Sequence, residues 1–523
     1  MSVLSELKLL HPCLRSRIHR IHSLSQPKPP SNNSGFVLYL PQVLLRYKQN
    51  PAFAVACHAA NELNVPLVVL AVVLDDASHS RNQPHRSPPS NNISSAAVVM
   101  TSRRLAFTLE ALSETCTKWS HHGAAVGIRI HSPKGRNPDH LSLCTKARLV
   151  VTDEPFVSPY TTFVARVEEA CRKSNVECLR VDGSCTVPPA QVLKRRSSNN
   201  SVIKYDVVPA KAYLWQNKTE HLRESHLNAA MEGHFDAPDL TIKVNDDILF
   251  GESNSDDDAM HNNLKDVFPS RWQAKPSNGE ALERCALPSA PDVRPFTSRE
   301  LETLSTTSEA AASTPKKDRY ADFALNWAGA DSTVPPCKQT IGTTSQGMQR
   351  WNNFNLSEYG KKRNDAKLVH SVSRMSAYLN LGIVSIFRLV WEVKRAQKQQ
   401  SKKTDSTKRS KWGKSGPDKY EEEIVKWREM SYAHAFARAD YDDVGSLPNW
   451  ALSCLNNHRS GRGGHTLQQL TNGTTGDTKW DAMQQYLVRT GELHNNGKSC
   501  NSFLQTCLCL LAATNLTQLY TMQ

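Results

Sequence analysis

Short apolar runs alternate with helical patterns over the first 190 positions of the chain. The run Pro66–Leu74 is rich in β-branched residues, which predicts a strand buried on both faces. Comparable runs predict further strands over 36–40, 124–130, 147–153 and 177–182. Helical spacing predicts helices over 51–63, 102–119 and 160–173. Because strands alternate with helices, we expect a doubly wound parallel sheet with ligand sites beyond the carboxyl ends of its strands.

The pattern changes beyond about residue 190, where strand-like runs nearly stop. Positions 350–496 are helical in pattern, interrupted by the basic stretch Lys394–Lys414. We interpret that stretch as a disordered loop, which either contacts phosphates or is simply a solvated run of charge. An α/β half followed by an all-helical half fits an enzyme whose cofactor sits among helices. The sheet half contains no glycine-rich phosphate loop of the standard kinds.

The first 34 residues differ in character from the rest. Glu6 is the one acidic residue before position 62, while Arg15, Arg17 and Arg20 cluster early. This composition is typical of a transit peptide, which would place the protein in a chloroplast or mitochondrion. The alternative is a plain basic disordered tail, and the nucleus is then the expected compartment.

Charge and cysteine content narrow the partners of the chain. The formal net charge is +14 over 523 residues, which favours polyanionic partners, with nucleic acid first. The 13 cysteines form no CxxC pair and none stands at zinc-ligand spacing from histidine, so we expect no metal. No apolar stretch is long enough to span a membrane, and we expect a monomer.

These observations divide the chain into five predicted segments. They are a basic disordered or transit-like segment over 1–34, an α/β domain over 35–190, a connecting region with disordered stretches over 191–349, a helical cofactor- and DNA-binding domain over 350–496, and an atypical tail over 497–523.

The first patch with candidate chemistry is Tyr359–Ser385. It contains Ser373 and Ser376 with Arg374 and Met375 between them, ahead of a predicted helix. Serine hydroxyls and free backbone N–H groups at a helix start bind phosphate, and an arginine neutralises it. Serines in this position also serve as ordinary N-caps, so the spacing alone does not distinguish a phosphate site from a helix cap.

The second patch is Tyr420–Tyr441. Glu423 and Trp427 are four residues apart, so one helix presents both on one face. Arg428 follows directly, and Leu447-Pro448-Asn449-Trp450 closes the region. Taken singly, these residues also suit an amphipathic helix with a buried tryptophan.

The third patch is Gly476–Asn495, with Trp480 near its start and His494 and Asn495 at its end. A single tryptophan in a helix more often belongs to a core than to a site.

Together the three patches resemble the photolyase/cryptochrome family of flavin photoenzymes, in its class II-like branch. The resemblance extends loosely to Arg46, Asn50 and Val151-Thr152-Asp153 in the sheet half. It implies FAD as cofactor, a second antenna chromophore in some members, and UV-damaged DNA as partner. The fold that it implies is an N-terminal doubly wound α/β domain followed by an all-helical FAD-binding domain.

The resemblance also implies a role for each matched residue. Tyr359, Ser373, Arg374, Met375 and Ser376 would hold the FAD diphosphate. Glu423 and Trp427 would face the flipped pyrimidine dimer, by hydrogen bonding to the base edge and by stacking. Arg428 would lie near the flavin or the DNA backbone, and Trp480 would relay electrons to the flavin. His494 and Asn495 would lie near the flavin and the lesion.

The match also fails in places. Val372 stands where a serine or threonine is usual, Ala366 replaces a proline, and Asn380-Leu381 replaces a common His-Phe pair. After Asn495 the family continues with an Arg-Met-x-Trp helix, whereas this sequence ends in a Cys/Leu/Thr tail. We therefore expect a helical domain that is incomplete at its C-terminus, through mis-splicing or true truncation.

Three functions follow from these patterns. The leading hypothesis is light-driven repair of cyclobutane pyrimidine dimers by electron transfer from reduced FAD, as a deoxyribodipyrimidine photo-lyase. The second is a blue-light receptor of the cryptochrome type without repair, which loss of Glu423 or Trp427 would have favoured. The third is a non-catalytic, truncated relative.

Overall fold

The structure is a computed structural model of the chain. It describes residues 7, 10–20, 35–74, 100–130, 138–196, 204–205, 208, 212–245, 268, 272, 296–298, 301, 317–327, 329–365, 368, 371–403, 414–438, 440–441, 447, 449–457, 465 and 467–492.

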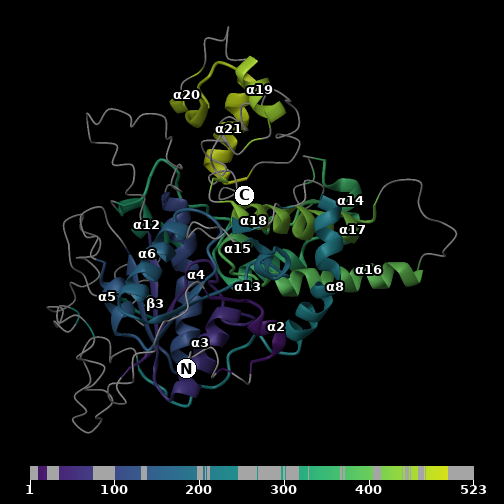
Figure 1. The fold of residues 1–523 in the computed structure, drawn as a ribbon. Helices are drawn as coiled ribbons and strands as arrows, with labels where there is room; N and C mark the ends of the chain where they lie inside the picture. The colour runs from purple at the N-terminus through teal and green to yellow at the C-terminus, as the bar shows by residue number, and fades with distance from the viewer. Residues whose placement is uncertain are drawn as a thin grey trace.

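A seven-stranded sheet organises the N-terminal half within these residues (Figure 1). Its strand order is β1-β6-β5-β2-β3-β4-β9, with five parallel central strands and an antiparallel strand at each edge. The strands are β1 (Ile18–Arg20), β2 (Val37–Leu40), β3 (Leu67–Val73), β4 (Ala125–Ile130), β5 (Leu149–Asp153), β6 (Glu177–Val181) and β9 (Phe296–Thr297). The predicted doubly wound parallel sheet is confirmed.

The centre of the sheet is buried on both faces, and strand β3 is apolar and buried at every position. Along β3, Val69 and Ala71 belong to one core, while Val68 and Leu70 belong to the core on the opposite face. This alternation follows from the two-residue period of a strand. The order of the strands reverses at β2, which pairs with β3 on one side and β5 on the other.

Helices cover both faces of the sheet and then form the rest of the molecule (Figure 1). Around the sheet these are α3 (Pro51–Leu63), α4 (Ser102–His121), α5 (Asp139–Lys146), α6 (Tyr160–Lys173) and α7 (Pro189–Val192). A two-stranded ribbon of β7 (Arg195–Arg196) and β8 (Lys204–Tyr205) leads to α8 (Ala212–Met231).

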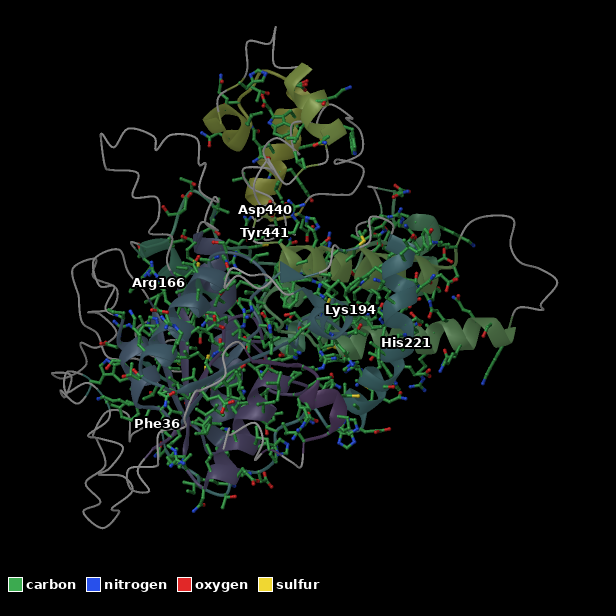
Figure 2. The ribbon with its side chains drawn as sticks, in the orientation of Figure 1. Phe36, Arg166, Lys194, His221, Asp440 and Tyr441 are labelled. Atoms are coloured by element: carbon green, nitrogen blue, oxygen red, sulfur yellow. The ribbon has the colours of Figure 1, made fainter. Side chains whose placement is uncertain are left out.

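The helical half begins with α12 (Lys317–Asn326), and the remaining helices of this half follow it along the chain. They are α13 (Thr344–Asn352), η5 (Leu356–Glu358), α14 (Tyr359–Lys362), α15 (Ser376–Asn380), α16 (Ile386–Lys403), α17 (Gly416–Glu421), η7 (Glu422–Trp427), α18 (Arg428–Ala437), α19 (Asn449–Asn457), α20 (Leu467–Asn472) and α21 (Thr478–Thr490). Figure 1 shows α19, α20 and α21 as a cluster beyond the layer formed by α17 and α18. Tyr441, labelled in Figure 2, joins the two halves, since its hydroxyl accepts the N–H of Ser158 at 2.8 Å.

The disorder expected over 1–34 is wrong for residues 11–20, whereas the transit-peptide hypothesis stays a prediction. Residues Pro12–Arg15 form helix α2, and β1 pairs antiparallel with β6. Arg17 is 1% exposed, with its guanidinium bound to backbone carbonyls. Composition alone cannot distinguish a buried arginine that binds backbone carbonyls from an arginine in a solvated tail. The error arose for this reason.

The prediction of a basic loop over Lys394–Lys414 is also wrong for its first part, because α16 continues to Lys403. Lys394 pairs with Glu220 at 2.6 Å and with Glu421 at 2.7 Å. These acids come from distant segments, so charge counting along the sequence cannot detect them. Residues 404–413 lie outside the described part, as does much of the predicted connecting region over 191–349.

Across the described ranges, none of the helices combines the length and the apolar character that crossing a bilayer requires.

Asp153, at the end of β5, gives the first prediction. Its buried carboxylate accepts from the Tyr39 hydroxyl at 2.8 Å and from the backbone N–H groups of Gln42, Val43 and Leu44 at 2.7, 2.8 and 3.0 Å. Asp153→Ala leaves four donors unmatched, so we expect the free energy of unfolding to fall by about 3 kcal/mol or more.

Urea unfolding of the full chain measures this change, with Asp239→Ala as the control. Asp239 is exposed, so its removal is expected to alter the free energy of unfolding by less than about 0.5 kcal/mol. Equal effects of the two substitutions would contradict the role given to Asp153.

Candidate functional site

Tyr359 begins α14 and lies in an aromatic cluster rather than at the surface. Its ring is 5.2 Å from that of Tyr420 and 5.6 Å from that of Phe354, measured between centroids. Burial raises the pKa of Tyr359 to about 12, so the phenol keeps its proton at neutral pH. The Tyr420 hydroxyl in turn donates to Ser373 Oγ at 2.9 Å, which connects the first predicted patch with the second.

The turn from Ser373 to Ser376 has the backbone geometry of an anion site. Arg374 has a φ of +55°, and Met375 follows in the right-handed helical region, before α15 begins at Ser376. Alternating left- and right-handed residues direct successive N–H groups into one concavity. Within the described residues, no acceptor is recorded for the N–H groups of Ser373, Arg374, Met375 and Ser376.

The side chains of this turn fit a diphosphate only in part. Because Ser373 accepts from Tyr420, its own hydroxyl proton can still be donated, and Ser376 is exposed. Met375 is fully buried and offers only its backbone. Arg374 pairs with Glu492 at 2.8 Å, so its charge is already neutralised. The backbone and the serines therefore suit a phosphate better than the predicted arginine does.

Glu423 and Trp427 lie on one helical run, as expected, but the turn that carries them is a π-helix. The widened i→i+5 turn spans Glu422–Trp427 between α17 and α18. Such turns are frequent at functional sites. The Trp427 side chain is 47% exposed, and Glu423 is also partly exposed.

The carboxylate of Glu423 is held by two cations that sequence reasoning missed. Arg363 of the segment after α14 lies 3.3 Å from Glu423 Oε1, and Lys419 of α17 lies 3.1 Å from the same atom. The backbone N–H of Arg363 also donates to the Tyr359 carbonyl at 3.0 Å. The spacing Lys419–Glu423 is i,i+4 and could have been found, whereas Arg363 is 60 positions away. Arg363 therefore connects Tyr359, which is predicted to bind the FAD diphosphate, with Glu423, which is predicted to contact the lesion.

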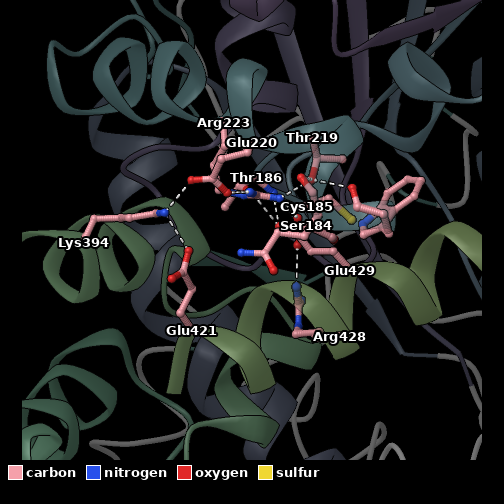
Figure 3. A network of polar contacts seen from close by, with 12 residues as sticks. Ser184, Cys185, Thr186, Thr219, Glu220, Arg223, Lys394, Glu421, Arg428 and Glu429 are labelled. Atoms are coloured by element: carbon pink, nitrogen blue, oxygen red, sulfur yellow. Dashed lines mark hydrogen bonds and ion pairs between the residues drawn. The ribbon is translucent and has the colours of Figure 1, made fainter. Parts of the chain in front are cut away.

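Arg428 contacts the protein interior. Its Nη1 donates to the Ser184 carbonyl at 2.7 Å and its Nη2 to the Leu379 carbonyl at 3.3 Å, while the guanidinium lies 4.6 Å from the centroid of the Tyr432 ring. Arg428 therefore links the loop after β6 to the end of α15, and its contact with flavin or DNA stays a prediction. Figure 3 shows the contact of Arg428 with Ser184.

Glu429, the next residue, is the buried centre of a polar network that the sequence analysis did not identify (Figure 3). Its Oε1 accepts from Thr186 N at 2.5 Å and Thr186 Oγ1 at 2.7 Å, and its Oε2 lies 3.5 Å from Arg223 Nη2. The available signal was the helix face, because Glu429 shares it with the buried Val425 and Ala433.

Trp480 is separate from the Glu423/Trp427 turn. It lies near the start of α21, and its Nε1 donates to the Leu470 carbonyl of α20 at 3.3 Å. This contact belongs to the outer cluster of α19, α20 and α21 (Figure 1). The structure thus brings Tyr359, Ser373, Glu423 and Trp427 into one region and leaves Trp480 outside it. His494 and Asn495 lie outside the described residues.

A cavity lies beyond the carboxyl ends of β2 and β3, where the strand order reverses. Gln42, Arg104, Thr108 and Tyr160 are among its lining residues. Arg104 donates from Nη2 to the Tyr160 hydroxyl at 2.8 Å, while Arg104 Nη1 and Gln42 Oε1 are buried without a hydrogen-bond partner in the described part of the chain. Open α/β sheets bind ligands at this position. The second antenna chromophore stays a prediction.

Comparison with known proteins agrees with this architecture. Residues 37–216 match the sequence model of the family described as DNA photolyase. A deoxyribodipyrimidine photo-lyase of Oryza sativa subsp. japonica is 28% identical over 141 residues, which are 27% of this chain and 25% of that protein. One of Potorous tridactylus is 29% identical over 156 residues, 29% of this chain and 27% of that protein.

Among solved structures, a Synechocystis sp. PCC6803 cryptochrome superimposes with a TM-score of 0.52 at 12% identity, covering 94% of this chain and 78% of that one. The chain therefore has the photolyase/cryptochrome fold. Residues 37–216 are a DNA photolyase domain of that family. The aligned region spans about a quarter of the length of the curated relatives.

Asp182, at the start of the loop that Arg428 contacts, gives a prediction on pH. Burial raises the pKa of its carboxyl to about 6, with the nearby Arg17 opposing the shift. A carboxyl whose pKa rises on folding stabilises the protein most at low pH, and this contribution is lost as pH rises from about 4 to about 6.

We therefore expect the unfolding free energy of the wild type, relative to Asp182→Asn, to fall by at most about 3 kcal/mol across that window. Urea unfolding between pH 4 and 7.5 measures the difference. A difference that stays constant with pH would show that Asp182 does not titrate in this range.

Proposed function

We propose that this protein binds FAD in its helical half and repairs cyclobutane pyrimidine dimers in DNA by light-driven electron transfer. The observation that carries the proposal is the exposed Glu423/Trp427 turn, where the Arg363 side chain pairs with Glu423 and the Arg363 backbone N–H donates to Tyr359, near the predicted phosphate turn. The DNA photolyase domain over residues 37–216 supports the same class of function. When bound, reduced FAD supplies the electron after absorbing blue or near-ultraviolet light.

The turn at Ser373–Ser376 is the proposed cradle of the FAD diphosphate. The backbone N–H groups of Arg374, Met375 and Ser376 line the concavity of this turn, and the serines at its two ends add hydroxyl donors, without a counter-charge from Arg374. Tyr420 orients the Ser373 hydroxyl, and Glu492 holds the Arg374 side chain to one side.

The Glu423/Trp427 turn is the proposed lesion contact. A half-exposed indole provides a face on which a flipped base can stack, and a carboxylate can accept from the N–H of a pyrimidine edge. A dimer is already poorly stacked in the duplex, so extruding it costs less free energy than extruding an intact base. Arg363 and Lys419 fix the position of the carboxylate before DNA arrives.

The phosphate turn can be tested by flavin binding. We expect Ser373→Ala combined with Ser376→Ala to weaken FAD binding by about tenfold or more, since each lost hydrogen bond to a charged group is worth about 1.5–3 kcal/mol. The control is Arg374→Gly, which keeps the backbone conformation and removes a guanidinium already bound to Glu492. We expect that variant to bind FAD within about threefold of wild type.

Fluorescence titration of the full chain with FAD reads both variants. The opposite order, with strong loss in Arg374→Gly and little loss in the serine variant, would show that the arginine rather than the turn holds the diphosphate.

The lesion turn can be tested with a duplex that carries one pyrimidine dimer. We expect Trp427→Ala to weaken its binding by about tenfold, because stacking of a base on an aromatic ring contributes about 1–3 kcal/mol. Trp450→Ala is the matched control, since Trp450 is 76% exposed but lies in the outer cluster. We expect Glu423→Ala to slow light-dependent loss of dimers.

Each outcome separates the proposed functions. A Glu423→Ala protein that repairs as fast as wild type would remove the role given to Glu423. Flavin photochemistry without loss of dimers would support a receptor of the cryptochrome type, and absence of flavin binding would support a non-catalytic relative.

A further inference from the structure

The loop Asp182–Thr186, which connects β6 to α7, has an arginine bound at every one of its carbonyl groups. Arg17 donates to the carbonyls of Asp182 at 3.1 Å, Cys185 at 2.9 Å and Thr186 at 2.5 Å. Arg46 donates to Gly183 O at 2.9 Å and Arg428 to Ser184 O at 2.7 Å. Arg17 lies in the turn between α2 and β1, Arg46 in the segment before α3 and Arg428 at the start of α18, so this loop joins three parts of the chain.

We call Arg17, Arg46 and Arg428 the arginine clamp. Arg17 is the most deeply buried of the three. Its guanidinium lies 4.7 Å from the centroid of the Phe235 ring and 4.5 Å from that of Phe387, and these two rings contact each other edge to face at 5.0 Å. The backbone around it is also fixed, because Ile18 pairs with Val181 at the end of β6. A planar guanidinium can lie against aromatic rings and donate to three carbonyls at once in a fixed geometry, which the compact ammonium group of lysine cannot reproduce.

The loop transmits this fixed position to the turn that carries Glu423 and Trp427. Arg428 and Glu429 follow Trp427 directly, and both bind the loop, at the Ser184 carbonyl and at Thr186. The loop is stiffened from within, because the Asp182 carboxylate accepts from the N–H groups of Ser184 and Cys185.

We propose that Arg17 is a positioning residue for the lesion-contacting turn, acting through loop Asp182–Thr186 on the start of α18. Residues Ile18–Arg20 and the helix before them are then a working part of the site. This assignment of a role in DNA recognition rests on the proposed function, whereas the mechanical link from Arg17 to α18 does not.

Hydrogen exchange measured by mass spectrometry tests the mechanical link without DNA. Arg17→Lys keeps the charge but loses the planar donor geometry, and we expect amides of α18 to exchange about tenfold faster or more, while those at the centre of α4 stay unchanged. Arg15→Lys is the matched control, since Arg15 is an exposed arginine two positions away. Unchanged exchange in α18 would overturn the proposal.

Phe387→Leu is a second variant in case Arg17→Lys unfolds. It preserves all three arginine hydrogen bonds and removes one ring face, so a smaller acceleration confined to the same helix is expected. Acceleration spread evenly over α4 and α18 would indicate general destabilisation and would also overturn the proposal.

DNA binding tests the role in recognition. We expect Arg17→Lys to lower the ratio of affinities for dimer-containing and undamaged duplex by about tenfold, with affinity for undamaged duplex unchanged. The effects of Arg17→Lys and Arg428→Lys on this ratio are expected to be non-additive, because both act on one loop. Additive effects, or a preserved ratio, would refute positioning. Faster exchange in α18 with a wild type that does not prefer damaged DNA would instead refute the proposed function and leave the link standing.

Discussion

The carbonyl groups of a loop buried between two domains must find donors, and in this protein arginines supply them. Loop Asp182–Thr186 has no regular secondary structure, so its backbone cannot be satisfied by a helix or a ladder. Arg17, Arg46 and Arg428 resolve this constraint from three directions. The sheet, the N-terminal segment and the helical half are therefore held by one set of charge-assisted hydrogen bonds.

Much of the sheet half could be predicted from the sequence, because apolar β-branched runs have few alternatives to a buried strand. The expected strand at 66–74 is β3, and the expected helix at 102–119 is the core of α4. What escaped prediction are elements whose stability comes from distant partners. Strand β1 has only three residues, and its sequence shows no strand pattern. It is stabilised by pairing with β6 and by the hydrogen bonds that the neighbouring Arg17 donates to loop carbonyls.

The candidate site shows the same division. The order of residues along the helical half pointed to Ser373, Glu423 and Trp427, and the structure gathers them within one region. The sequence could not show that Arg374 is neutralised by Glu492, or that Trp480 belongs to an outer cluster. Ion pairs between remote positions depend on tertiary packing, and a spacing rule along one helix carries no information about them. For the same reason the sequence did not distinguish the buried Glu429 from the exposed charged residues of the same helix.

Strand β1 also has a consequence for how the sheet meets its surroundings. Without it, β6 would form the edge of a parallel sheet, with a row of unpaired N–H and C=O groups open to pairing with another chain. The family match begins at residue 37, so a shortened protein cut at that boundary would contain every parallel strand of the sheet and yet expose this edge. Such a protein would be prone to associate through β6. By pairing with β6, the N-terminal segment therefore protects the sheet from pairing with other chains.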